Sequence, residues 1–335
     1  MKHTLHTLFL IALLTACVVP PGTSSTPEPT SPSATPTPVA TVTAAPTTLL
    51  DVYEQNIHLF DYEADSPVPV TEESVQQEDG YTVHDIHYPS PKTGDVPAYL
   101  FVPEGPGPYA GIILMHGSSG SRRTLLPLAQ DLVHTGAVVL TLSAPSARTP
   151  GQDWITFTPQ DREDQIQLML DLRRAVDLLA EHEKVDPTRL GYLGYSYGAA
   201  MGGLLAGIEP RIKAYGLMVG DGGLVAHFME DGEPVGGFEQ FNTATRERWL
   251  EAMEPIEPIH YVGHAAPSAL FFQNARRDQS VTEGDALAYQ AAGSEPKRVE
   301  WYDSGHGLPR QAYMDMVNWL GEQIGIDVAK FVAHP

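Results

Sequence analysis

Ser196 stands at the centre of the pattern Gly194-Tyr195-Ser196-Tyr197-Gly198, where an apolar run gives way to small residues. A serine in this setting is typical of a tight turn between a strand and a helix, which presents the hydroxyl clear of the sheet. The serine backbone is strained in such a turn, and the two glycines leave room for it. The pattern predicts that Ser196 is a nucleophile. A glycine-rich turn that merely contains a serine is the alternative.

A nucleophilic serine needs a neighbouring base, because its hydroxyl hardly ionises near neutral pH. We expect this base to be a histidine on a loop late in the chain. His306 lies in the loop 303–307, directly after the predicted strand 298–302, and is placed between Gly305 and Gly307, which let the loop bend back over the sheet. The sequence therefore predicts that His306 is the general base.

The base in turn needs an acid that holds its tautomer. Asp278 follows the predicted strand 268–273 and lies between the serine and the histidine in chain order. Asp221, which follows the predicted strand 212–219, is the main rival. Asp303 is a weaker rival, because it is too close to the histidine in sequence to brace the ring. We predict Asp278 as the acid.

Acyl transfer also requires hydrogen-bond donors for the oxyanion, and the loss of one donor typically costs about 10²–10³ in turnover. The backbone N–H of Tyr197, just after the serine, is one candidate. The loop that follows the apolar run 111–115 begins His116-Gly117-Ser118, and we expect the Ser118 N–H to be the second donor. His116 is expected to be a hydrogen-bonded loop residue and not an acid or base.

The elements that must position these residues alternate along the chain between short apolar runs and longer amphipathic segments. Such alternation predicts an α/β fold with a mostly parallel central sheet and helices on both faces, whose active site lies at the carboxyl ends of the strands. We expect strands at 82–88, 96–102, 111–115, 137–142, 189–195, 212–219, 268–273 and 298–302, and helices at 122–135, 158–185, 197–207, 283–292 and 309–324.

A long connection separates the predicted strands 212–219 and 268–273, where a simple crossover needs far fewer residues. Aromatic residues are scattered through it, which suggests a small lid insertion over residues 222–265. We expect Phe228 and Trp249, together with Trp154 from an earlier loop, to line a substrate pocket. Alternatively, the aromatic side chains only anchor the insertion to the core.

Three features together resemble the α/β-hydrolase superfamily. They are the chain order Ser196, Asp278, His306, the serine turn, and the His-Gly loop. The stretch from Val185-Asp186-Pro187 to the serine turn is most similar to its dienelactone-hydrolase-like branch. Dienelactone hydrolases carry a cysteine nucleophile and this chain a serine, so lactone specificity is not implied. The resemblance implies a carboxylic ester hydrolase that acts through an acyl-enzyme. A prolyl-oligopeptidase-like serine peptidase and a catalytically silent binding module are the alternatives.

The N-terminal segment 1–16 reads as an export signal, with Lys2 followed by a short apolar core. Leu14-Thr15-Ala16-Cys17 resembles the lipobox of bacterial lipoproteins, which implies lipidation of Cys17. Residues 17–48 are rich in Pro, Thr and Ser and are expected to form a disordered tether. The hydrolase domain would then occupy residues 49–335, exported and anchored to a membrane through the lipid at Cys17.

The chain carries 42 acidic and 20 basic residues, a net charge of −22, which argues against a nucleic-acid partner. It contains one cysteine, so an internal disulfide and a cysteine-based metal site are excluded. His260 and His264 have no evident third ligand, and no phosphate-binding glycine loop is present. We therefore expect no metal and no cofactor. The expected partner is a small-molecule or polymer ester, and the oligomeric state stays open.

Overall fold

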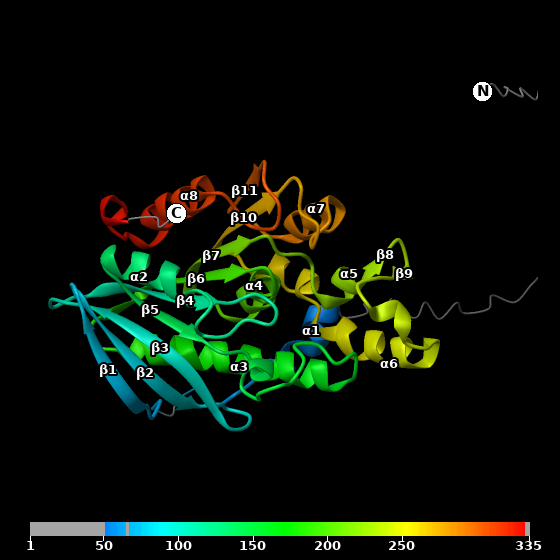
Figure 1. Ribbon diagram of the computed structural model, residues 1–335, viewed down its shortest axis with the longest axis horizontal. Coiled ribbons are helices and arrows are strands. Elements are labelled where there is room, and N and C mark those ends of the chain that lie inside the picture. The colour runs from blue at the N-terminus through cyan, green and yellow to red at the C-terminus, as the bar shows by residue number, and fades with distance from the viewer. Residues whose placement is uncertain (1–50, 65–66, 332–335) are drawn as a thin grey trace, which may run out of the picture. The chain divides into compact units, whose positions relative to one another are not determined.

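The computed structural model describes residues 51–64 and 67–331. The predicted export signal, Cys17 and the tether lie outside these residues. The centre of the described region is a nine-stranded sheet with the order β1-β2-β3-β5-β4-β6-β7-β10-β11 (Figure 1). Its strands are β1 (Thr71–Glu78), β2 (Tyr81–Pro89), β3 (Asp95–Pro103), β4 (Tyr109–Met115), β5 (Ala137–Leu142), β6 (Val185–Tyr195), β7 (Ile212–Met218), β10 (Ala269–Ala275) and β11 (Lys297–Tyr302).

From β5 to β11 every neighbouring pair of strands is parallel, whereas β1, β2 and β3 join the sheet in antiparallel pairs. Every residue of β5 and of β10 is buried, as expected for parallel strands that are covered on both faces. The predicted α/β class with a mostly parallel sheet is confirmed.

Helices cover both faces of the sheet and define two apolar cores. On one face lie α2 (Leu126–His134) and α8 (Arg310–Ile324). On the other lie α3 (Gln160–Glu181), α4 (Tyr197–Ile208) and α7 (Glu283–Ala292). In Figure 1 the helices α2 and α3 lie on opposite sides of the strands. No helix among the described residues combines the length and the apolar character that crossing a membrane requires.

The insertion between β7 and β10 contains α5 (Leu224–Phe228), a two-stranded ribbon of β8 (Met229–Glu230) and β9 (Glu233–Pro234), and α6 (Thr243–Met253). Its aromatic side chains pack around Phe157, whose ring lies 4.8 Å from Phe228, 4.9 Å from Phe238 and 5.4 Å from Trp249 between ring centres. The indole N–H of Trp249 donates to the buried carboxylate of Asp161 over 2.8 Å. Aromatic packing and one buried hydrogen bond thus fix the insertion to the core.

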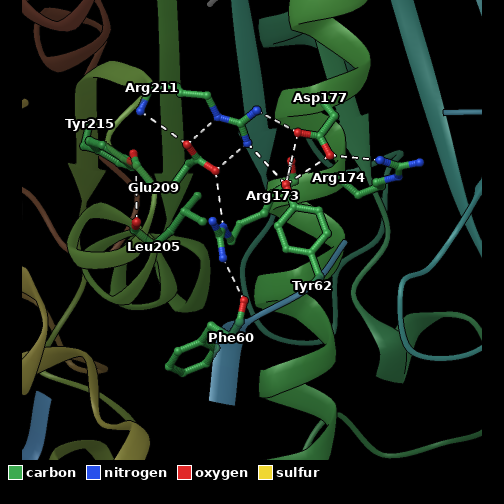
Figure 2. A network of polar contacts seen from close by, with 9 residues as sticks. All are labelled: Phe60, Tyr62, Arg173, Arg174, Asp177, Leu205, Glu209, Arg211 and Tyr215. Atoms are coloured by element: carbon green, nitrogen blue, oxygen red, sulfur yellow. Dashed lines mark hydrogen bonds and ion pairs between the residues drawn. The ribbon is translucent and has the colours of Figure 1, made fainter. Parts of the chain in front are cut away.

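A network of charged side chains joins α3 to the turn between α4 and β7 (Figure 2). The Arg211 guanidinium donates to Asp177 over 2.7 Å and to both carboxylate oxygens of Glu209 over 2.7 Å each. Arg174 and the Tyr62 hydroxyl also donate to Asp177, each over 3.0 Å. The side chains of Asp177 and Glu209 are only 4% and 1% exposed. Each buried carboxylate therefore depends on its cationic partners.

Replacing Asp177 with asparagine is expected to lower the free energy of unfolding by about 3–5 kcal/mol, because the buried Arg174 would lose its counter-charge and Arg211 would keep only Glu209. Urea denaturation measures the change. The matched control is Glu300→Gln, which removes the partner of Arg298 from a pair whose side chains are 38% and 42% exposed. This control should change the unfolding free energy by less than about 1 kcal/mol. Equal losses of unfolding free energy in Asp177→Asn and Glu300→Gln would contradict the prediction.

Candidate active site

Ser196 occupies the sharp turn between β6 and α4, with φ 54° and ψ −118°. Positive φ is unfavourable for a serine, so the surrounding structure must hold it in place. A Cβ atom on Gly194 would lie 2.1 Å from the Gly198 carbonyl oxygen, and one on Gly198 would lie 2.4 Å from that of Met115. Both positions therefore require glycine, and the strained turn presents the Ser196 hydroxyl at the carboxyl end of the sheet.

The structure brings Ser196, His306 and Asp278 together from three separate strand ends. Nε2 of His306 lies 2.9 Å from Oγ of Ser196. Nδ1 of the same ring lies 3.0 and 2.9 Å from the two carboxylate oxygens of Asp278. The geometry leaves Nδ1 protonated and donating to the carboxylate, so Nε2 is free to accept the serine proton.

The loop after β10 holds the Asp278 carboxylate in its ionised form. Oδ1 accepts hydrogen bonds from the backbone N–H groups of Ser280 over 2.8 Å and Val281 over 3.2 Å. Burial raises the pKa of Asp278, but the hydrogen bonds from His306, Ser280 and Val281 outweigh it, so the pKa lies below the usual aspartate value. A permanent negative charge therefore faces the imidazole.

Tyr195 anchors the loop that carries His306, a contact that the sequence does not reveal. Its hydroxyl donates to the backbone carbonyl of His306 over 2.7 Å, and the two rings pack edge to face at 5.5 Å. Burial raises the pKa of Tyr195 to about 12, so the hydroxyl keeps its proton. The residue before the serine thus helps to place the histidine.

Replacing Tyr195 with phenylalanine keeps the ring packing but removes one hydrogen bond of roughly 1 kcal/mol. We expect kcat to fall about fivefold with little change in KM, because the imidazole spends less time in place. Steady-state kinetics on an ester measures both constants. The control is Tyr53→Phe, which removes a comparable bond to the Gly207 carbonyl and should leave kcat unchanged. A rise in KM at constant kcat would contradict the positioning role.

The two rival carboxylates have other partners. Asp303 forms an exposed ion pair with Arg277 at 3.3 Å. Asp221 is buried and lies 2.8 Å from Nδ1 of His227, not beside His306. Chain order alone does not exclude Asp221 as the acid that orients His306. Among the described residues, Asp278 alone of the three carboxylates contacts the His306 ring.

Ser118 and Tyr197 lie on the wall of the cavity that Ser196 also lines. Tyr197 is the first residue of α4, where backbone N–H groups lack a carbonyl partner one turn earlier in the helix. His116 is buried in the same loop: its Nδ1 donates to the Gly117 carbonyl over 2.7 Å, and its Nε2 accepts from Ala144 N–H over 3.1 Å. Burial lowers the pKa of His116. Both of its nitrogen atoms are engaged in holding the loop.

The cavity beside Ser196 is lined mainly by apolar side chains. Trp154 lies on its wall as expected, whereas Phe228 and Trp249 do not. Phe228 packs behind Trp154 at 5.9 Å between ring centres, and Trp249 is fully buried. The expected roles of these two residues as pocket walls do not fit this placement, because the aromatic packing that anchors the insertion removes both rings from the surface. Helix α5 instead contributes Leu224 and His227.

No cluster of three or more His, Cys, Asp or Glu side chains that could hold a metal ion occurs among residues 51–64 and 67–331. His260 pairs with Glu254 at 3.0 Å, and His264 stacks on Tyr53 at 3.7 Å between ring centres. These two histidines are therefore engaged in local packing. The prediction that the protein uses neither a metal nor a cofactor stays a prediction.

No protein-family model matches the chain. Over 186 residues the chain is 26% identical to the mitochondrial acyl-coenzyme A thioesterase 2 of mouse, a stretch that covers 52% of this chain and 38% of the thioesterase. The chain thus spans well under half the length of this curated relative.

Two solved structures resemble the chain over most of its length. An acetyl xylan esterase from Paenibacillus sp. matches with a TM-score of 0.67 and 16% identity, over 81% of this chain and 93% of the esterase. Acetyl xylan esterase 1 from Thermoanaerobacterium sp. matches with a TM-score of 0.67 and 14% identity, over 84% and 94%. At this identity the likeness concerns the fold.

Proposed function

We propose that this chain, which has the α/β-hydrolase fold, is a serine hydrolase that cleaves carboxylic esters through an acyl-enzyme. The hydrogen-bonded series Ser196–His306–Asp278 at the carboxyl end of the sheet is the observation that carries the proposal. The similarity to two esterases and a thioesterase supports the same reaction class.

In the proposed reaction, Oγ of Ser196 attacks the ester carbonyl carbon while Nε2 of His306 takes the hydroxyl proton. The resulting imidazolium is stabilised by the Asp278 carboxylate. The N–H groups of Tyr197 and Ser118 donate to the negatively charged oxygen of the tetrahedral intermediate. The imidazolium then protonates the leaving alcohol, and a water molecule, activated by the same ring, hydrolyses the acyl-enzyme.

A fluorophosphonate label followed by peptide mapping tests the nucleophile. A panel of aryl esters, acyl thioesters and peptide amides then tests the reaction class. We expect labelling of Ser196 and cleavage of esters. Cleavage of peptide amides alone would favour a peptidase, and an unlabelled Ser196 would favour a binding module.

We further propose that the protein is exported and anchored through an acylated Cys17, which would be its one contact with a membrane. The lipobox-like run before Cys17 supports this proposal. Growth with an alkyne-labelled fatty acid should label the wild-type protein. Cys17→Ser should abolish both the label and recovery in the membrane fraction. Equal labelling of this variant would contradict the proposal.

A further inference from the structure

His227 lies on the wall of the cavity next to Ser196, and the proposed reaction gives it no role. Its Nδ1 lies 2.8 Å from Oδ2 of Asp221, and its ring packs edge to face on Phe228 at 4.9 Å. The Asp221 side chain is 7% exposed and that of His227 is 29% exposed. The cavity therefore contains a histidine–carboxylate pair separate from the one that serves Ser196.

Two buried carboxyl groups fix the backbone that carries His227. Glu257, which is 2% exposed, accepts from the N–H groups of Leu224 and Val225 over 3.0 Å each. Asp221 accepts from the N–H of Gly223 over 3.3 Å as well as from the imidazole. The ring is thus held in place before any ligand arrives.

Nε2 is the polar atom of His227 that stays available to a ligand, since Nδ1 is occupied by Asp221. Within residues 51–64 and 67–331, Nε2 has no hydrogen-bond partner. Much of the surrounding cavity wall is apolar and includes Trp154, Ala200 and Leu224. A pure hydrocarbon group would cover Nε2 without offering it a partner, which is unfavourable. A well-matched ligand therefore places a polar atom against this nitrogen.

The cavity corresponds to the acyl side of an ester. The leaving oxygen must lie beside His306 to receive its proton, and His306 is not on the cavity wall. Ser196 and the two candidate oxyanion donors, Ser118 and Tyr197, are on that wall, so the group attached to the carbonyl carbon extends toward His227. The enclosed part of the cavity has room for little more than one water molecule, so an acyl chain that reaches His227 must be short and must lie partly in the open mouth of the cavity.

The charges around His227 favour a neutral ligand. Burial lowers the pKa of His227, but the hydrogen bond and charge of Asp221, together with Asp285 and Asp278, raise it above the usual histidine value. An anionic acyl group would lie beside the Asp221 carboxylate, which is on the cavity wall. A hydroxyl group avoids that repulsion, and it can accept from a protonated Nε2 or donate to a neutral one.

We propose that Nε2 of His227 binds a hydroxyl group on the acyl chain, so that the enzyme selects esters of short hydroxy acids over esters of unsubstituted acids of the same length. This inference rests on the proposed function. His227 is then a specificity-determining residue, and Asp221 positions its ring.

The test compares 4-nitrophenyl 3-hydroxybutyrate with 4-nitrophenyl butyrate on the same preparation of each variant. For the wild type we expect kcat/KM to be about tenfold higher for the hydroxy ester. His227→Leu should bring this ratio near one, and His227→Gln, which keeps a hydrogen-bonding group, should restore part of it. The control is His84→Leu, which removes a histidine that pairs with Glu72 at 2.7 Å outside the cavity. The control should keep the wild-type ratio.

A wild-type ratio near one, or an unchanged ratio in His227→Leu, would overturn the inference. If the wild type cleaves neither ester, the proposed function fails, and binding is then measured in Ser196→Ala. Methyl 3-hydroxybutyrate should shift one histidine imidazole signal in the NMR spectrum, and methyl butyrate should not. The shift should be absent from the double variant S196A/H227L. No difference between the two methyl esters would count against His227 as a hydroxyl-binding residue.

Discussion

Replacing Ser196 with alanine is expected to lower kcat for ester hydrolysis by about 10⁵–10⁶-fold, the loss typical of a removed serine nucleophile. The substitution deletes only Oγ, which lies 2.9 Å from Nε2 of His306. Stopped assays at high enzyme concentration measure the residual rate.

The fold should tolerate this change, because the strained turn keeps its glycines and its hydrogen bond from Ser196 N–H to the Met218 carbonyl at 2.8 Å. Circular dichroism and the melting temperature serve as controls and should match the wild type. A residual rate within about tenfold of the wild type would mean that the nucleophile lies elsewhere.

Replacing Asp278 with asparagine is expected to lower kcat by about 10⁴-fold. The backbone N–H groups of Ser280 and Val281 point at Oδ1, so the amide oxygen takes that place and the NH₂ group takes the place of Oδ2. Oδ2 lies 2.9 Å from Nδ1 of His306. The NH₂ hydrogens then favour an imidazole with an unprotonated Nδ1, whose protonated Nε2 cannot accept the serine proton.

Asp303→Asn is the matched control for this prediction. It neutralises a neighbouring carboxylate whose side chain is 79% exposed and which pairs with Arg277. We expect kcat to stay within about twofold, because an exposed ion pair contributes little. A larger loss of kcat in Asp221→Asn than in Asp278→Asn would mean that the earlier strand supplies the acid.

The parallel part of the sheet could be predicted because each buried strand is a short apolar run bounded by turn residues. The run 137–142 agrees with β5 residue for residue. Strand β1 escaped prediction because every one of its residues is exposed and all but Val75 are polar, and only its pairing with β2 makes it a strand. Helix α2 begins at Leu126, later than expected, because Pro127 is tolerated only in the first turn.

Site residues at strand ends could be located from the sequence, because parallel strands deliver their following loops to one edge of the sheet. The places of His227 and Tyr195 in the site could not be located in this way. His227 lies on a five-residue helix, which is too short to show a periodic pattern. The sequence also does not tell whether Asp221 pairs with His227 or with His306. Tyr195 acts on a backbone carbonyl, and such a contact leaves no trace in side-chain spacing.

The attachment of the insertion to the core has a consequence for how substrates enter. Swinging this segment away would uncover Phe228, Phe238 and Trp249 and would break the bond between the Trp249 indole and Asp161. Both changes are costly in water. We therefore expect the insertion to stay in place when a substrate enters, so that the size of the existing opening limits access to Ser196. Under the proposed function, we then expect dissolved monomeric esters to be cleaved without prior adsorption of the enzyme to an oil–water interface.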